Sequence, residues 1–217
     1  MKYFSTILII LGMYFFVFAC AEKPCTDDGC ENFNELTIPE PLEDIRGSVV
    51  KEYSVVPVVA TDNKDDFVYS LNKCITHLYK NVPTEKQIPR ELIIAQAALE
   101  TGWGESRFAN EANNLFGIRT WNKDEKYLLP IPWTKWPGWG VKVFETKCDS
   151  VAHYIRMINE VFAYEEFREV RAKILEHGEV PNGLDLAPTL TKYASRANYT
   201  ELVATLIKYN IRGVYEL

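Results

Sequence analysis

Two stretches of apolar residues near the middle of the chain predict two helices of different kinds. Residues 65–81 place apolar side chains at positions 67, 71, 74, 75 and 78, so we expect an amphipathic helix that ends before Pro83. The next stretch begins at Pro89, a residue typical of a first helical turn, and is apolar from Leu92 to Leu99 apart from Gln96. A helix that is apolar nearly all round is expected to be buried.

The pattern changes after this helix. Residues 101–104 (TGWG) stop it, a short helix is expected over 105–111, and residues 113–119 are a turn-rich loop. Between 121 and 145 proline and glycine forbid a helix, and residues 126–131 and 140–144 are the expected arms of a small hairpin.

Helical patterns then resume and continue to the end of the chain. Four helices are predicted, at 148–161, 165–176, 184–193 and 199–210. The expected fold class is therefore mainly α (α+β), a helical domain with a small β-hairpin lobe.

The first 20 residues have the pattern of an export signal. Lys2 is followed by an uncharged apolar stretch from Ile7 to Phe18, then by Ala19 and Cys20. This ending resembles a bacterial lipobox, in which the cysteine is lipidated and becomes the mature N-terminus, although Phe18 is bulkier than that motif usually has. A plain cleaved signal and an uncleaved anchor are the alternatives. All three predict an exported protein of the periplasm or cell envelope, and the lipobox predicts a lipoprotein held at the membrane.

Acidic residues are concentrated directly after this signal. Residues 22–66 carry a net charge of −8, whereas residues 67–217 carry +1. The acidic stretch contains four prolines and no helical period, so we expect a signal peptide at 1–19, an extended tether at 20–61 and a catalytic domain at 62–217. No basic stripe is present, which argues against nucleic acid as a partner.

The cysteines and histidines limit the chemistry. Five cysteines fit an exported protein; with lipid on Cys20, the pairing of Cys25, Cys30, Cys74 and Cys148 stays open among three possibilities. The three histidines are too scattered to predict a metal site, and we expect no cofactor.

Glu100 is the strongest candidate for catalysis. It lies four residues after Gln96, on the same face of the buried helix, and at the helix C-terminus, where the backbone dipole disfavours negative charge. Trp103 can supply an apolar wall beside it. These effects predict a carboxyl group that stays protonated near neutral pH and acts as a general acid. The alternative is an exposed glutamate at a helix end.

Tryptophans and asparagines suggest a carbohydrate ligand. Four tryptophans lie within 19 positions of the proline-rich region: Trp121, Trp133, Trp136 and Trp139. Indole rings stack well on the apolar faces of sugar rings, but these side chains can equally pack the hairpin onto the helices. Asn113 and Asn114 either bind the acetamido group of a sugar or cap the turn.

The segment 95–119 (AQAALETGWGESRFANEANNLFGIR) closely resembles the signature of the bacterial glucosaminidase family of cell-wall hydrolases, nearest its Bax-type branch. Further blocks agree in the same order, at 144–154 and at 190–202 (LTKYASRANYTEL). The resemblance implies a lysozyme-like fold with a β lobe beside a substrate groove. It also implies hydrolysis of the β-1,4 bond after N-acetylglucosamine in peptidoglycan.

The resemblance also implies roles for individual residues. Glu100 matches the catalytic acid, and Tyr193 matches a tyrosine that positions the reacting sugar or water, whereas we assign Tyr199 to packing because of its spacing with later apolar residues. The expected substrate-binding residues are Trp103, Asn114, Phe116, Trp133, Trp136 and Trp139. We expect a monomer whose partners are peptidoglycan, or a related N-acetylglucosamine glycan, and the membrane.

The hairpin departs from the family. Many relatives carry a second glutamate there, and here Asp124 and Glu125 are the only acidic residues, neither in a recognisable counterpart of the motif. If one of them faces Glu100 across room for a water, an inverting mechanism follows; otherwise the 2-acetamido group of the substrate assists.

Three other function classes compete with a hydrolase of the glycan. A binding module would use the tryptophans without needing Glu100. An amidase or thiol peptidase would need clustered histidine or cysteine pairs, and only Cys74/His77 and Cys148/His153 are close in sequence. An inactive relative would hold partners at the envelope.

Overall fold

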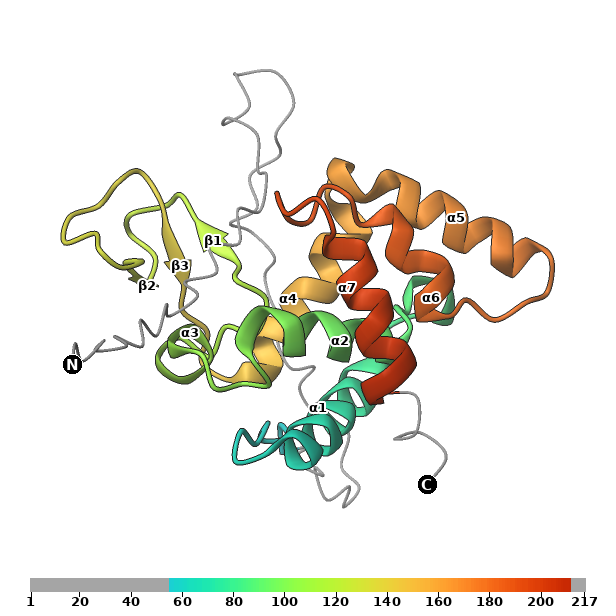
Figure 1. Cartoon of the computed structure of the whole chain (residues 1–217), viewed down its shortest axis with the longest axis horizontal. Helices are drawn as coiled ribbons and strands as arrows, with labels where there is room; N and C mark the ends of the chain where they lie inside the picture. The colour runs from blue at the N-terminus through green and yellow to red at the C-terminus, as the bar shows by residue number, and fades with distance from the viewer. Residues whose placement is uncertain (1–54, 212–217) are drawn as a thin grey trace, which may run out of the picture.

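The computed structural model describes residues 55–211 (Figure 1). The predicted signal peptide, the lipidation residue Cys20, the cysteines at 25 and 30 and the tether up to residue 54 lie outside these residues. The last residues of the predicted tether pack on the domain: Val59 is buried, and the backbone N–H of Ala60 donates to Ser70 Oγ at 2.8 Å. Within residues 55–211, no helix is long and apolar enough to cross a membrane.

The two predicted helices form with boundaries shifted by one or two residues. The first, α1 (Lys64–Tyr79), begins after Asn63, whose side chain accepts a hydrogen bond from the backbone N–H of Asp66. The second, α2 (Arg90–Thr101), is buried along most of its length, as predicted. It contacts α1, α6 and α7, and Figure 1 shows it in the middle of the helical part.

The remaining helices complete this helical part. They are α3 (Arg107–Glu111), α4 (Lys147–Glu160), α5 (Glu165–Glu176), α6 (Gly183–Leu186) and α7 (Tyr199–Leu206). A reciprocal pair of hydrogen bonds between Thr146 and Asp149 starts α4. A disulfide between Cys74 and Cys148 joins α1 to α4, which selects one of the pairings that the sequence left open for these two residues.

One predicted helix is wrong. Instead of a continuous helix over 184–193, the chain forms the single turn α6, then a 3-10 turn over Ala187–Thr189, and a loop that contains Tyr193. Pro188 explains the break, because proline has no N–H to donate and its ring clashes with the preceding turn of an α-helix. Tyr193 is therefore held by a loop.

The β lobe has three short strands, seen to one side of the helices in Figure 1. Strands β2 (Tyr127–Leu128) and β3 (Gly140–Lys142) are the predicted hairpin arms, and β1 (Arg119–Thr120) adds a strand where a loop was expected. The order is β1-β3-β2, antiparallel throughout, with Arg119 opposite Val141 and Leu128 opposite Val141 on the other side. A Cβ at Gly140 would lie 2.8 Å from the Tyr127 side chain, so this strand position needs glycine.

Candidate active site

The carboxyl group of Glu100 lies buried at the C-terminal end of α2. Both of its oxygens are shielded from solvent, and neither makes a hydrogen bond to any residue of the described part of the chain. Helix α2 ends directly after it, because Gly102 takes a left-handed conformation with φ of 59°. The position predicted from the helix pattern is therefore observed.

Burial dominates the charge state of this carboxyl group. It raises the pKa of Glu100 from 4.5 to about 8, while the nearby hydroxyl of Tyr199 opposes the shift without reaching hydrogen-bond geometry. The electrostatics thus agree with the predicted acid that is protonated at neutral pH.

A chain of three polar side chains leads to Glu100 from the core. Tyr154 on α4 donates its hydroxyl proton to Gln96 Oε1, and Gln96 Nε2 donates to the hydroxyl oxygen of Tyr199 at 2.9 Å. Gln96 is completely buried one helical turn before Glu100. Burial, and then the charge of Glu100, raises the pKa of Tyr199, so this hydroxyl stays protonated.

Tyr193, the tyrosine that the resemblance singled out, is buried and committed to protein contacts. Its hydroxyl donates to the carbonyl oxygen of Phe116 at 3.0 Å, and its ring stacks on Tyr199 with centroids 5.3 Å apart. Tyr199 does pack in the core, as expected, but its hydroxyl also lies beside Glu100. That polar role was missed, because both tyrosines sit in one short motif and only tertiary contacts separate them.

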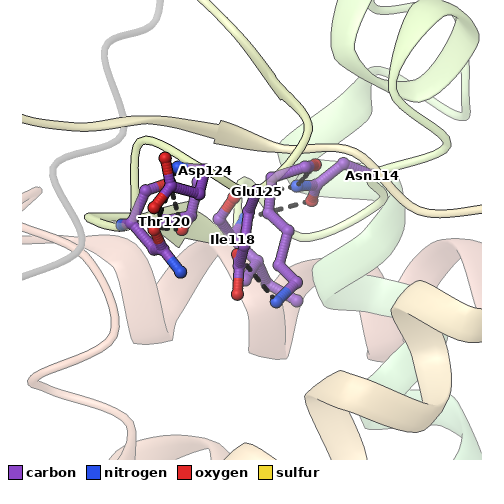
Figure 2. A network of polar contacts seen from close by, with 7 residues as sticks. Asn114, Ile118, Thr120, Asp124 and Glu125 are labelled. Atoms are coloured by element: carbon purple, nitrogen blue, oxygen red, sulfur yellow. Dashed lines mark hydrogen bonds and ion pairs between the residues drawn. The ribbon is translucent and has the colours of Figure 1, made fainter. Parts of the chain in front are cut away.

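The loop between α3 and β1 passes next to Glu100. Asn114 holds this loop: its amide donates to the carbonyls of Ile118 and Lys142, both at 2.8 Å, and its oxygen accepts from the Ile118 backbone at 3.0 Å (Figure 2). Both amide protons of this buried side chain are thus used. Asn114 therefore has no donor left for a sugar, and the turn-holding alternative describes it.

Two neighbours in this loop define the wall of the site. Phe116 is buried and stacks on Tyr154 with ring centroids 4.3 Å apart. Gly117 has φ of 64°, and a Cβ there would lie 3.8 Å from Glu100 Oε2. Gly117 therefore brings bare backbone against the carboxyl group.

The two acidic residues of the β lobe differ from each other. Asp124 is exposed, whereas Glu125 Oε2 accepts from Lys142 Nζ at 3.0 Å (Figure 2). Burial by itself would raise the pKa of Glu125, but Thr120, Lys142 and the charge of His153 lower it overall. Since different groups shift the pKa values of Glu125 and Glu100, the two carboxyl groups lie in separate electrostatic surroundings.

The tryptophans divide between packing and exposure. The half-buried Trp103 makes an edge contact with Phe67 and lies under Lys64 Nζ, 5.1 Å from its ring centroid. Trp136 packs on Tyr127, and Trp139 lies under the guanidinium of Arg119. Trp121 and Trp133 are about half exposed, at 53% and 52%. The lobe thus presents some indole surface to solvent while using the rest to hold its strands.

No group of three metal-ligating side chains occurs within residues 55–211. Burial first, and then the charges of Lys142 and Arg156, lower the pKa of His153 to about 4, so its imidazole is neutral at neutral pH. Glu100 is thus a protonated carboxyl group beside neutral tyrosines, and Glu125 on the lobe is ionised and paired with Lys142.

The sequence is similar to a known protein family and to a curated protein. Residues 76–212 match the family described as mannosyl-glycoprotein endo-β-N-acetylglucosaminidase. Protein Bax of Escherichia coli strain K12 is 27% identical over 128 residues, which cover 58% of this chain and 44% of that protein. The matched region thus spans less than half the length of that relative.

Solved structures share the fold. The catalytic domain of the autolysin Auto from Listeria monocytogenes has a TM-score of 0.52 at 21% identity, covering 72% of this chain and 90% of that chain. A peptidoglycan hydrolase mutant from Sphingomonas sp. A1 has a TM-score of 0.51 at 20% identity, covering 70% of this chain and 98% of that chain. These likenesses confirm the expected lysozyme-like, mainly helical architecture.

Proposed function

Because this chain belongs to the glucosaminidase family and is a glycoside hydrolase, we propose that it cleaves the β-1,4 bond after N-acetylglucosamine in peptidoglycan, with Glu100 as the general acid. The solved structures of its fold include proteins named as an autolysin and a peptidoglycan hydrolase, which supports this substrate.

The observation that carries the proposal is the buried, unpaired carboxyl of Glu100. A pKa of about 8 keeps this group protonated at neutral pH, in the form that an acid catalyst needs. In the proposed step the Glu100 proton moves to the glycosidic oxygen as the bond between that oxygen and the anomeric carbon breaks. The leaving sugar departs as an alcohol, and Glu100 is left as a carboxylate.

The second half of the reaction needs a nucleophile at the anomeric carbon. The ion pair of Glu125 with Lys142 and the exposed position of Asp124 favour a structural or solvated role for both carboxylates. We therefore assign the nucleophile to the 2-acetamido oxygen of the substrate, as in other substrate-assisted glycosidases. Water then attacks the anomeric carbon of the cyclic intermediate and gives one proton to the Glu100 carboxylate, which restores both the acetamido group and the protonated acid.

Other residues serve binding and position. Trp133, exposed on the β lobe, is the candidate for stacking on a sugar ring, with Trp136 and Trp139 beside it in sequence. Tyr193 acts indirectly, because its ring supports Tyr199 and its hydroxyl fixes the backbone at Phe116. Trp103, three positions after Glu100, packs its ring against Phe67.

The place of action follows from the substrate. Peptidoglycan lies outside the cytoplasmic membrane, so the proposed activity requires export, for which the pattern of residues 1–20 is suited. We propose lipidation at Cys20, with the part of the 20–61 segment that precedes the packed residues Val59 and Ala60 as the tether that lets the domain reach the glycan. Mass spectrometry of the mature N-terminus from a bacterial host tests this: a diacylated cysteine is expected, and an unmodified residue would overturn it.

The cleavage proposal is tested by digesting purified sacculi with the protein and with its Glu100→Gln variant. Fragments are reduced with borohydride and weighed by mass spectrometry. Reduced N-acetylglucosamine ends, absent with the variant, are expected. Reduced muramic acid ends would assign the other glycosidic bond, free peptides would assign an amidase, and retained binding without release would assign a binding module.

A further inference from the structure

We propose that Gln96 is a positioning residue that points the hydroxyl proton of Tyr199 at the Glu100 carboxyl group. This inference deepens the proposed function and rests on Glu100 being the acid. It assigns a role in the reaction to a buried amide that touches no reacting atom.

The contacts of Gln96 define the direction of its amide. Its oxygen accepts the proton of Tyr154, and its nitrogen donates to the oxygen of Tyr199. A hydroxyl that accepts one hydrogen bond still has its own proton to donate. The proton of Tyr199 is therefore free to turn toward another acceptor.

If the oxygen and nitrogen of the Gln96 amide exchanged places, both tyrosines would still have a hydrogen bond to it. In that arrangement Tyr199 would donate to Gln96 Oε1, and the amide nitrogen would donate to Tyr154. Glu100 decides between them, because its buried oxygens have no hydrogen-bond partner among residues 55–211. Only the observed direction leaves a Tyr199 proton for that carboxyl group, and a buried acceptor without a donor costs free energy.

Within residues 55–211, the groups whose pKa values the charge of Glu100 raises are four tyrosines. Tyr154 comes from α4, Tyr164 from the turn before α5, Tyr193 from the loop before α7, and Tyr199 from α7 itself. Burial raises the pKa of each, so all four are neutral across the pH range in which Glu100 titrates. Two of these four tyrosines, Tyr154 and Tyr199, are hydrogen-bonded to Gln96.

The chain of contacts acts after Glu100 has given up its proton. The new carboxylate then accepts the Tyr199 proton as a hydrogen bond, which stabilises the ionised form and makes Glu100 a stronger acid. Without this hydrogen bond the pKa of Glu100 would rise further, and proton transfer to the glycosidic oxygen would become harder.

The test measures the pKa of Glu100 by carbon NMR of the side-chain carboxyl in the full-length protein and in four variants. Tyr199→Phe removes the donor, and we expect the pKa of Glu100 to rise by about one unit, the worth of a hydrogen bond to a charged group. Tyr154→Phe touches only the far side of Gln96, and we expect a smaller rise. Tyr164→Phe, a matched loss of a hydroxyl outside the chain of contacts, is expected to leave the pKa unchanged.

The pKa of Glu100 in the double variant Tyr154→Phe/Tyr199→Phe shows whether Tyr154 acts on Glu100 through Gln96 and Tyr199 or independently of them. If Tyr154 acts through Gln96 and Tyr199, its replacement adds nothing to the shift of Tyr199→Phe. Equal additive shifts, no shift in Tyr154→Phe, or an equal shift in Tyr164→Phe would each overturn the proposal. Because the NMR readout needs no turnover, a protein that cleaves no glycan would refute the proposed function while leaving this measurement valid.

Discussion

The ring of Tyr193 lies on the ring of Tyr199, with centroids 5.3 Å apart and planes inclined by 17°. The stack joins two parts of the site, because Tyr193 donates to the backbone at Phe116 while Tyr199 accepts from Gln96 beside Glu100. One aromatic pair thus connects the loop that borders the carboxyl group with the helix that carries it.

Replacing Glu100 by glutamine is expected to abolish the general acid and lower kcat by roughly 10²- to 10⁴-fold. The same variant is expected to be more stable than the native protein at alkaline pH. Between about pH 4.5 and 8 the folded protein holds a proton on Glu100 that the unfolded chain has released. The native free energy of unfolding therefore falls by about 1.4 kcal/mol per pH unit from this residue alone.

Urea unfolding of both proteins at several pH values between 5 and 9 measures this effect. The difference in unfolding free energy should move in favour of Glu100→Gln as pH rises, and flatten above about pH 8. A difference independent of pH over this range would mean that Glu100 ionises normally in the folded protein.

Replacing Glu125 by glutamine is expected to leave turnover unchanged, because the proposed nucleophile belongs to the substrate. The loss of the partly exposed ion pair between Glu125 and Lys142, at 3.0 Å, should lower the free energy of unfolding by at most about 1 kcal/mol. Initial rates on sacculi for Glu125→Gln and Asp124→Asn check the expectation. A loss of turnover comparable to that of Glu100→Gln, in a folded variant, would identify a second catalytic carboxylate.

Trp133→Ala is expected to weaken binding to sacculi by roughly 2- to 10-fold, the worth of one aromatic stacking contact. Its stability should change little, since the side chain is 52% exposed. Trp121→Ala is the matched control, because Trp121 is exposed to a similar extent, at 53%. Equal losses of binding in both variants would show a general effect of lobe hydrophobicity in place of a stacking site at Trp133.

The disulfide between Cys74 and Cys148 closes a loop with a sequence separation of 74. In the chain-entropy account this constraint contributes about 4 kcal/mol to the free energy of unfolding. Denaturant unfolding of Cys74→Ala/Cys148→Ala should show a loss of this order, with product chemistry unchanged where the variant is folded. An unchanged unfolding free energy would show that helix packing alone holds α1 against α4.

The sequence predicted the elements whose signal is local. Helix α2 and the position of Glu100 follow from apolar spacing and from the glycine that ends the helix. Pro188 is a local signal too, because proline disfavours the interior of an α-helix. The helix predicted over 184–193 is wrong because that prediction followed the apolar spacing and left Pro188 out of account.

The remaining features depend on contacts between distant residues. Gln96 and Tyr199 are 103 positions apart, so no periodicity predicts their hydrogen bond. The side chain of Asn114 is equally suited to a sugar and to a turn, and only the carbonyl of Lys142 next to it shows which role it takes. Strand β1 has two residues, too few for an alternating pattern.

The pKa of Glu100, measured by NMR titration of its side-chain carboxyl carbon in the native protein, tests the central claim most directly. We predict a value near 8, well above the ordinary 4.5, together with a loss of hydrolytic rate as pH rises through the same value. A pKa near 4.5 would contradict the account, because Glu100 would then be ionised at neutral pH and unable to donate the proton that the proposed reaction requires.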